Sequence, residues 1–375
     1  MKRLRPISSV KRLEGKRVLV RVDMNVPIEK GKVVDGPHGR IAQAAKGIQM
    51  LCKKGARVIV ITHLGRPKSA ADRSARLAPV AARLSALLDA PVLYNGSLVD
   101  EKAQALVARL KNGGVALLEN LRYDKREEEN DAQFARELAA LADLYVDDAF
   151  GVSHRAHASV VAITRELPSY VGPLLAREIA VLTDVMTKPK RPFVLLLGGA
   201  KMETKIGLIT QLGKKANVIC IGGALAHTFL VAKGEKIGKS LYEKDQVKVA
   251  KTLLATFGKK IVLPVDFVLK DKAIQDVGPR TMRNFLRELQ KAKTIVWNGP
   301  LGRCEVEPFC EATHLAARAI AAMPAKTIVG GGDTVPIIES LGLADRFTHV
   351  STGGGAMLAF LSGERLPGIE ALMVT

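Results

Sequence analysis

Short runs of β-branched and other apolar residues alternate with longer Ala- and Leu-rich stretches of helical spacing, and this alternation is the strongest constraint on the fold. The runs occupy residues 18–22, 58–61, 115–118, 193–197, 218–221, 261–263, 294–297, 327–329 and 349–351. Such alternation is typical of parallel sheets that are covered by helices on both faces. Ligands of such sheets bind at the carboxyl ends of the strands. The residues that follow each apolar run are therefore the candidate site residues.

The chain is long enough for two α/β domains, since it has 375 residues. Apolar residues at helical spacing predict a helix over residues 174–186. Pro189 and Pro192 follow and break any helix, and a new strand begins at Phe193. We therefore expect two domains of similar size that are joined by this helix. The charged residues 124–131 are interpreted as a solvated loop and the start of a helix.

The chain is strongly basic, because 57 Lys and Arg residues against 37 Asp and Glu residues give a net charge of +20. A nucleic-acid-binding protein would explain this charge. The basic residues are nevertheless spread along the chain without a basic tail, and aromatic residues make up only 4%. Few aromatics argue against a base-stacking surface. We therefore expect weak, salt-dependent binding to nucleic acid at most, and no specific nucleic-acid partner.

Cysteine usage and hydropathy indicate the compartment. The four cysteines form no CxxC pair, are too sparse for a disulfide framework and fit a reducing compartment. The first 17 residues lack the apolar segment of a secretory signal. The most apolar long stretch, residues 216–232, contains Gly222, Gly223 and His227 and falls short of a membrane-spanning helix. We expect a cytoplasmic protein without a membrane partner.

Basic residues follow several strands of the N-terminal half. In a parallel sheet they would converge at one edge; they are Arg21, Arg40, His63, Arg66, Arg122, His154, Arg155 and His157. The planar fork of arginine suits phosphate and carboxylate groups, so such an edge would bind a small polyanion. Asp23 and Asn25 add acceptors for substrate hydroxyls. The alternative is that each arginine is a surface or ion-pair residue.

Glycine turns follow the strands of the C-terminal half, at residues 198–199, 222–223, 330–332 and 353–355. Glycine allows close approach of the backbone, and a following helix directs N–H groups at phosphate. There is no GxxxxGK[ST] motif, and no GxGxxG opens a helix after a first strand, which argues against a P-loop and against an NAD-linked oxidoreductase. Tight strand–helix packing can explain one glycine pair, whereas four such turns favour a nucleotide phosphate site.

Ordered motifs along nearly the whole chain resemble those of phosphoglycerate kinases. They are RVDMNVP, THLGRP, LLENLRY, DDAFGVSHRAHAS, GGAKMETKIG, GGALAHTF, KGEKIGKSLYE, DVGPRT, VWNGPLG, GGGDT and STGGGAMLAFLSGERLPG. The resemblance implies two Rossmann-like domains, each a parallel sheet flanked by helices, joined by an interdomain helix and hinge. It also implies a monomeric, Mg²⁺-dependent enzyme of glycolysis and gluconeogenesis. On hinge closure this enzyme would transfer a phosphoryl group directly and reversibly between 1,3-bisphosphoglycerate and ADP, giving 3-phosphoglycerate and ATP.

The resemblance further implies four segments. They are a 3-phosphoglycerate domain over residues 1–172, an interdomain helix and linker over 173–192, a nucleotide domain over 193–355, and a segment over 356–375 that returns to the first domain. The implied substrate-binding residues are Asp23, Met24, Asn25, Arg40, His63, Leu64, Gly65, Arg66, Arg122 and Arg155. Asp23 and Asn25 would hold the glycerate hydroxyl and carboxyl end. The 3-phosphate would be held by His63, Arg66, Arg122 and Arg155.

The implied nucleotide-binding residues lie in the second domain. They are Lys201, Lys205, Gly222, Gly223, Asn298, Pro300, Glu305, Gly331, Gly332, Asp333 and Thr334. Asp333 would hold Mg²⁺, and Glu305 would hold the ribose. The implied catalytic groups are Arg40, Lys201 and the backbone N–H groups of Gly353 and Gly354. The accepting carboxylate is already ionised, so no general base is needed.

This chain departs from the family pattern at three places. Residues 266–276 are shorter than usual, and we expect this loop to be peripheral to the chemistry. Arg303 and Cys304 precede Glu305 where Val and Phe are usual. Ala224 replaces the usual third glycine near the adenine pocket.

Overall fold

The computed structural model describes residues 3–69 and 71–374, and the chain divides into two compact units. The first unit contains Met1–Ala180 and Arg365–Thr375, and the second contains Val181–Glu364. The division falls inside helix α5 (Pro173–Thr187), which confirms the helix predicted over residues 174–186.

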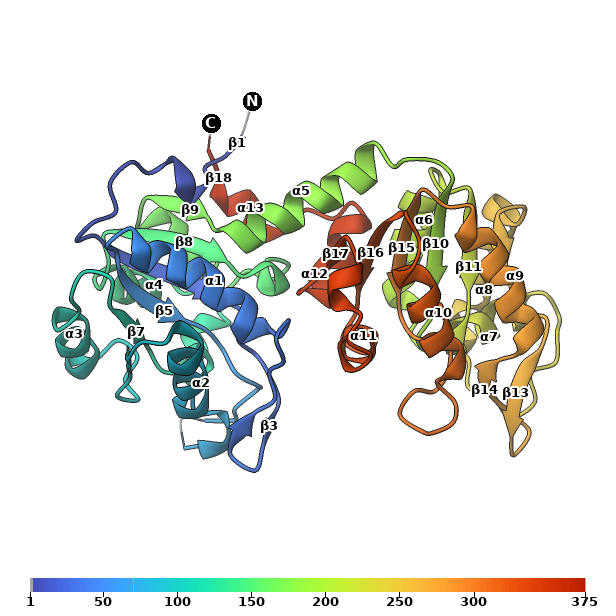
Figure 1. Ribbon diagram of the computed structural model, residues 1–375, viewed down its shortest axis with the longest axis horizontal. Coiled ribbons are helices and arrows are strands. Elements are labelled where there is room, and N and C mark those ends of the chain that lie inside the picture. The colour runs from blue at the N-terminus through green and yellow to red at the C-terminus, as the bar shows by residue number, and fades with distance from the viewer. Residues whose placement is uncertain (1–2, 70, 375) are drawn as a thin grey trace. The chain divides into compact units, whose positions relative to one another are not determined.

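The first unit is built on a six-stranded parallel sheet in the order β6-β7-β5-β2-β8-β9. Four of these strands, β5, β7, β8 and β9, are labelled in Figure 1. The strands are β2 (Arg17–Val22), β5 (Arg57–Ile61), β6 (Val92–Leu93), β7 (Val115–Leu117), β8 (Leu144–Asp148) and β9 (Ser169–Val171). The helices are α1 (Arg40–Lys53), α2 (Ala78–Leu88), α3 (Glu101–Ala108) and α4 (Ala132–Ala139). A small hairpin joins β3 (Ile28–Glu29) to β4 (Lys32–Val33).

Side-chain alternation along β2 explains how the sheet is covered. Val18 and Val20 point to the face where Ile48 of α1 and Leu84 of α2 complete one apolar cluster. Leu19 is also fully buried, on the opposite face. Because both faces are buried, residues 18–20 of the strand form a continuous apolar run and not an alternating one, as in parallel sheets generally.

The end of the chain also belongs to the first unit. Helix α13 (Pro367–Leu372) leads into β18 (Met373–Val374), which pairs antiparallel with β1 (Arg3–Leu4). The amide of Gly368 donates to the carbonyl of Ser153 at 2.9 Å. The residues before Arg365, including helix α12 (Gly354–Leu361), lie in the second unit.

The second unit has its own six-stranded parallel sheet, in the order β12-β11-β10-β15-β16-β17. The strands are β10 (Phe193–Leu197), β11 (Val218–Ile221), β12 (Ile261–Val262), β15 (Thr294–Asn298), β16 (Lys326–Gly330) and β17 (His349–Val350). The other helices are α6 (Glu203–Gly213), α7 (Gly223–Ala232), α8 (Val247–Phe257), α9 (Pro279–Gln290), α10 (Glu311–Ala321) and α11 (Val335–Ser340). The second unit also contains an antiparallel hairpin of β13 (Phe267–Lys270) and β14 (Ala273–Val277).

The predicted fold class of parallel sheets flanked by helices is confirmed, and each of the nine predicted apolar runs forms a strand. The periodicity did not single out β6, β8 or β9 or the short hairpins. In the parts of the chain that the structure describes, each helix is too short or too polar to cross a lipid bilayer.

Candidate functional site

Four arginines of the first unit converge on His63, which follows β5. Burial is the largest cause that lowers the pKa of His63 well below 6.5. The positive charges of four arginines lower this pKa as well; they are Arg21, Arg122, Arg40 and Arg155. Arg21 and His63 are almost inaccessible to solvent, with exposed fractions of 1% and 5%. His63 is therefore neutral at physiological pH, and the arginines carry the positive charge.

The proton of His63 can be placed from its contact with Arg21. The Nη2 group of Arg21 lies 3.2 Å from Nδ1 of His63. A guanidinium can only donate, so Nδ1 must be the acceptor. The proton of the neutral ring then sits on Nε2, which leaves His63 with a hydrogen-bond donor and no charge.

A buried carboxylate holds Arg21 in this position. Arg21 Nε donates to Ser159 Oγ at 3.0 Å, and Ser159 Oγ donates to Glu127 Oε1 at 2.6 Å. Glu127 also accepts the amide of Ser159 at 2.9 Å. Burial raises the pKa of Glu127, and the positive charge of Arg21 opposes this shift. The prediction that residues 124–131 form a solvated loop is wrong at Glu127, which has no exposed surface.

The other histidines of this edge are uncharged as well. Burial, together with the charges of Arg21 and Arg122, lowers the pKa of His157 to about 4. Burial and Arg155 lower the pKa of His154, whose Nε2 accepts a hydrogen bond from Arg155 Nε at 3.3 Å. The positive charge is thus concentrated on guanidinium groups, which are suited to bidentate contacts with phosphate.

Arg122 and Arg66 extend this cluster. Burial is the largest cause of the lowered pKa of Arg122, and Arg66 contributes to it. Arg122 Nη1 donates to the carbonyl of Gly65 at 2.5 Å, and its Nε lies 3.1 Å from the exposed carboxylate of Glu128. Arg66 is exposed and makes no hydrogen bond or ion pair with other described residues.

Arg40 and Asp23 form a tight pair beside the cluster. Arg40 Nη1 donates to both carboxylate oxygens of Asp23, at 3.1 and 3.0 Å, and to the carbonyl of Asn25 at 3.1 Å. The side-chain oxygen of Asn25 accepts the amide of Gly65 at 2.8 Å. These contacts join the loop after β2 to the loop after β5.

Two of the predicted substrate-binding residues make their contacts within the protein itself. The side chain of Met24 is fully buried in the core, and its amide donates to Thr62 Oγ1 at 3.0 Å. The amide and carbonyl of Leu64 are both bonded to the side chain of Asn120, at 3.1 and 2.8 Å. Asn120 also accepts the amide of Arg122, so it aligns two of the loops. Asn120 was visible in the LLENLRY motif, but its role was not anticipated.

The neutral state of His63 predicts its behaviour in a pH titration. We expect its imidazole NMR signals to stay constant from pH 8 down to pH 5 in the ligand-free protein, because its pKa lies well below 6.5. An inflection near pH 6.5 at His63 would show that its environment is not the cationic one described.

The site of the second unit lies where its strand order reverses. By position in the chain the order is 3-2-1-4-5-6, so β10 and β15 flank the switch point, where open α/β sheets bind ligands. The backbones following these strands are in close contact. A Cβ on Gly198 would lie 2.1 Å from the carbonyl oxygen of Pro300, and Gly299 has a φ of +94°. Only glycine allows this approach.

A second backbone cluster joins the loops after β15, β16 and β17. Asn298 Nδ2 donates to the carbonyl of Gly330 at 2.7 Å, and Thr334 Oγ1 accepts the amide of Gly299 at 2.9 Å. Gly331 has a φ of +123°, and a Cβ on Gly354 would lie 3.3 Å from its Cα. The structure therefore brings together the predicted residues 298, 331, 334 and 354. Gly332 lies in the same loop, and Gly353 precedes Gly354 as the residue that caps α12.

The two predicted lysines differ in environment. Lys205 on α6 is 7% exposed, and burial lowers its pKa to about 8, while the nearby charge of Asp333 opposes this shift. Lys201 precedes α6 and is exposed. Its carbonyl accepts a hydrogen bond from Thr204 Oγ1 at 3.0 Å. A partly desolvated lysine beside a carboxylate suits a polyphosphate with a bound cation.

A pocket of about 510 Å³ lies at this switch point, within the usual range for small-molecule sites. Gly223, Pro300, Glu305 and Asp333 line it among the predicted nucleotide-binding residues. Other predicted residues are not among its lining residues; they are Lys201, Lys205, Gly222, Asn298, Gly331, Gly332 and Thr334. The amide of Gly222 bonds to the carbonyl of Leu197 at 2.8 Å, so Gly222 supports the turn.

The hairpin of β13 and β14 forms part of the wall of this pocket. Phe267, Ile274 and Gln275 all line it. The expectation that the shortened segment 266–276 is peripheral is therefore wrong. His227 also lines the pocket, with Nδ1 2.8 Å from the carbonyl of Leu241. The only signal for His227 was its place in GGALAHTF.

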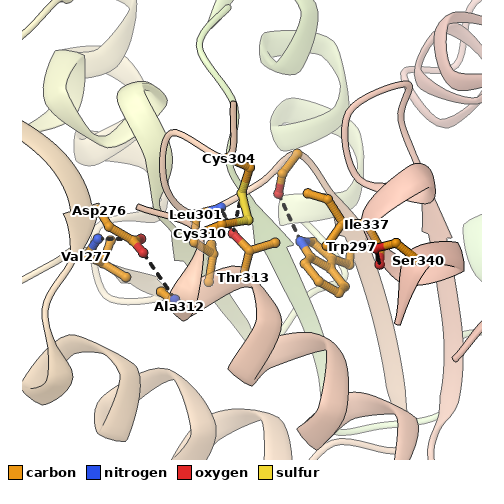
Figure 2. The surroundings of a disulfide bond; sticks show 11 residues. Asp276, Val277, Trp297, Leu301, Cys304, Cys310, Ala312, Thr313, Ile337 and Ser340 are labelled. Atoms are coloured by element: carbon orange, nitrogen blue, oxygen red, sulfur yellow. Dashed lines mark hydrogen bonds between the residues drawn. A yellow bond between two sulfur atoms is a disulfide. The ribbon is translucent and has the colours of Figure 1, made fainter. Parts of the chain in front are cut away.

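A disulfide joins Cys304 to Cys310 next to this pocket (Figure 2). The cysteine count argued against a disulfide framework, and this single crosslink was not anticipated from the sequence. The pair brackets Glu305, which lines the pocket. Sequence spacing alone did not distinguish these residues from Cys52 and Cys220, which are free thiols.

The carboxylate of Asp333 fits a Mg²⁺ ion that arrives with a nucleotide. Within residues 3–69 and 71–374, no group of three or more His, Cys, Asp or Glu side chains could hold a metal ion. Mg²⁺ in phosphoryl-transfer sites needs no such group, because one or two carboxylates and the substrate phosphates hold it. Asp333 lines the pocket close to Lys205, so carboxylate, cation and phosphate can meet there.

Comparisons with known proteins all find similarity to the same protein family. The profile of the family described as "Phosphoglycerate kinase" matches residues 7–364. The chain is 47% identical to the phosphoglycerate kinase of Thermomicrobium roseum, over 96% of this chain and 97% of that protein. The enzyme of Moorella thermoacetica is 46% identical over 96% of this chain and 97% of its own length.

Solved structures show the same similarity. The phosphoglycerate kinase of Pyrococcus horikoshii OT3 matches with a TM-score of 0.88 at 32% identity, covering 98% of both chains. That of Coxiella burnetii matches with a TM-score of 0.84 at 36% identity, covering 99% of both chains.

Proposed function

The chain belongs to the phosphoglycerate kinase family, and on that basis we propose that it transfers a phosphoryl group reversibly between 1,3-bisphosphoglycerate and ADP, with Mg²⁺, to give 3-phosphoglycerate and ATP. It is a kinase, a transferase of glycolysis. The observation that best supports the proposed substrate is the convergence of Arg21, Arg40, Arg122 and Arg155 on the neutral, buried His63. So much positive charge around a buried ring favours a phosphorylated acid as the ligand.

In the first unit we assign the 3-phosphate to the guanidinium groups and to Nε2–H of His63. The uncharged ring adds a donor to the site without adding to the repulsion among the arginines. Asp23 and Asn25 are placed beside Arg40, where they can accept hydrogen bonds from the glycerate hydroxyl. Met24 and Leu64 act through packing and backbone order, since Met24 is in the core and the backbone of Leu64 is engaged.

In the second unit we assign the nucleotide base and ribose to the pocket beside Gly223, Pro300 and Glu305. Lys205 and residues 331–334 would hold the phosphates, and Asp333 would hold Mg²⁺. A bound polyphosphate would also compensate the desolvation that lowers the pKa of Lys205 to about 8.

The proposed chemistry needs positioning and charge stabilisation more than proton transfer. The acceptor in the ATP-consuming direction is the carboxylate of 3-phosphoglycerate, which is already ionised. Arg40, Lys201 and the amides of Gly353 and Gly354 would stabilise the charge on the transferring phosphoryl group. Mg²⁺, when bound with the nucleotide, supplies further charge neutralisation. Transfer would follow closure of the two units, because water would otherwise hydrolyse the acyl phosphate.

The reaction is tested with a coupled assay of ATP consumption. We expect consumption to require both 3-phosphoglycerate and Mg²⁺, with ADP and 1,3-bisphosphoglycerate as products. Consumption of ATP that is independent of 3-phosphoglycerate, or no consumption at all, would contradict the proposal.

Arg66 offers a test of which unit binds which ligand. We expect Arg66→Ala to weaken 3-phosphoglycerate binding about 10- to 100-fold, the contribution of one hydrogen bond to a charged group. ADP binding should stay unchanged in calorimetry. Because Arg66 is exposed and makes no hydrogen bond or ion pair with other described residues, the fold should be unaffected.

Lys68→Ala is the matched control for this prediction, since it removes a positive charge from the same exposed loop. It should leave the affinity for 3-phosphoglycerate within about twofold of wild type, as expected for a screened surface charge. Equal losses for 3-phosphoglycerate and ADP in Arg66→Ala would contradict the assignment of the units.

A further inference from the structure

The segment between β15 and α10 carries Glu305 at the edge of the candidate nucleotide pocket. Gly302, Arg303 and Glu305 all line this pocket. Glu305 is exposed, and its side chain makes no hydrogen bond or ion pair with other described residues. Its position therefore depends on how the backbone on either side of it is held.

The two ends of this segment are anchored to the same elements. The amide of Leu301 donates to Thr313 Oγ1 at 2.9 Å, and the amide of Arg303 donates to the carbonyl of Gln275 at 2.8 Å. At the other end, Asp276 accepts the amides of Val277 and Ala312, at 2.8 and 3.1 Å, and so ties α10 to β14 (Figure 2).

Between these anchors the segment has only local backbone hydrogen bonds. Val306 donates to the carbonyl of Arg303 at 3.1 Å, and Phe309 donates to that of Val306 at 2.9 Å. The disulfide between Cys304 and Cys310 is the one covalent link across this part of the described chain. Its sulfur at Cys304 lies 3.4 Å from Thr313 Oγ1, whose hydroxyl is the available donor because a disulfide has no S–H.

We propose that the Cys304–Cys310 disulfide is a positioning crosslink that holds Glu305 at the rim of the nucleotide pocket. It closes the chain from the residue before Glu305 to the residue that caps α10. With the crosslink intact, the Glu305 carboxylate is confined to the pocket edge before the nucleotide binds. Without it, nucleotide binding must also order this loop, which reduces the affinity. The inference rests on the proposed function, since it concerns that nucleotide site.

The crosslink makes the nucleotide site responsive to a dithiol reductant. A thiolate of the reductant attacks one sulfur of the disulfide and forms a mixed disulfide, releasing the other cysteine as a thiolate that takes up a proton. The second thiol of the reductant then displaces the remaining cysteine. The disulfide gains two electrons and two protons in total, and the dithiol becomes a cyclic disulfide. Cys310 is 2% exposed, whereas Cys304 is only half-buried, so Cys304 is the more accessible of the two residues.

The other two cysteines do not interfere with a test of this kind. Burial raises the pKa of Cys52 to about 11, and it raises the pKa of the fully buried Cys220 further. Both therefore carry less thiolate near neutral pH than an ordinary cysteine and react more slowly with a thiol reagent. Labelling of the native protein with a thiol reagent thus reports on Cys304 and Cys310.

The experiment compares the oxidised and dithiothreitol-reduced forms of the full-length protein. We expect reduction to raise KM and Kd for Mg·ADP about 3- to 10-fold, the worth of one ordered hydrogen bond. The KM for 3-phosphoglycerate and kcat should stay constant, and reoxidation should restore the affinity. A merely stabilising disulfide would shift the unfolding temperature and leave the KM for Mg·ADP unchanged, which would overturn the proposal.

Three variants complete the test. The double variant Cys304→Ser, Cys310→Ser should have the reduced affinity in both conditions, while Cys52→Ser should respond to reductant as wild type does. In Glu305→Ala, reduction should have little further effect, because the crosslink acts through this side chain. An equal effect of reduction in Glu305→Ala, or two reactive thiols in the oxidised protein, would overturn the inference. If no phosphoryl transfer occurs in either state, the proposed function fails instead, and calorimetry with Mg·ADP still decides the role of the crosslink.

Discussion

Replacement of Lys201 by alanine is expected to lower kcat about 10²- to 10³-fold, the usual cost of removing one preorganised donor from a transition state. The proposed role of Lys201 is to follow the phosphoryl group during transfer, when charge develops on its oxygens. Such an interaction is stronger in the transition state than in either bound ligand. The loss should therefore appear in kcat, with ADP affinity in calorimetry near that of wild type.

The substitution Lys201→Ala should remove the side chain without disturbing the fold. The side chain is exposed at the start of α6, and Thr204 bonds to the backbone carbonyl, which alanine retains. The unfolding temperature should therefore stay close to that of wild type. Lys205→Ala provides the contrast, because Lys205 is buried beside the charge of Asp333 and its loss should weaken nucleotide binding itself. Near-normal turnover of Lys201→Ala would remove Lys201 from the mechanism.

The parallel sheets could be predicted because their strands are buried on both faces. Val18, Leu19 and Val20 are all within the core, so the strand appears in the sequence as a continuous apolar run. In contrast, β8 ends in Asp147 and Asp148, two buried acids that interrupt such a run. Burial raises the pKa of Asp148 to about 7, and its carboxylate accepts the amide of Leu175 at 3.0 Å. Local hydropathy does not reveal a polar residue that is buried to serve a distant amide.

The candidate site could also be predicted only in part: the sequence indicated its residues at strand ends but not the contacts between its loops. Residues at the carboxyl end of a strand or just after it, such as Arg21 and Gly331, are placed by the topology of the sheet. Contacts between loops depend on tertiary packing, which no local pattern encodes. Glu127 belongs to a charged segment that was predicted to be solvated, yet its side chain is buried and bonded to Ser159. Cys304 and Cys310 were two of four scattered cysteines until the fold placed them together.

Arg40→Ala is expected to lower kcat by a similar factor of about 10²–10³, because the contacts of Arg40 hold its guanidinium in a fixed orientation. Arg40 is the first residue of α1, and its Nη1 group is held by both oxygens of Asp23 and by the carbonyl of Asn25. The guanidinium is therefore oriented before substrate binds, and its other donors remain for the proposed contacts with the reacting carboxylate and phosphoryl group. A preorganised cation costs no rearrangement at the moment of transfer.

Loss of Arg40 also leaves the carboxylate of Asp23 without its cation. Because the proposed substrate is an anion, the KM for 3-phosphoglycerate should rise in Arg40→Ala, while the KM for ADP should not. Arg40→Lys should restore only part of kcat, since lysine keeps the charge but lacks the planar fork that bonds Asp23 and a ligand together.

Arg57→Ala is the control for the loss of charge alone. Arg57 begins β5 and donates to Asn112 at 3.1 Å, so it lies at the end of the strand opposite to His63. Its replacement removes one positive charge from the same unit and should leave kcat and both KM values nearly unchanged. If Arg57→Ala lowered kcat as much as Arg40→Ala does, the general positive potential of the protein would explain catalysis, and a positioned arginine would not.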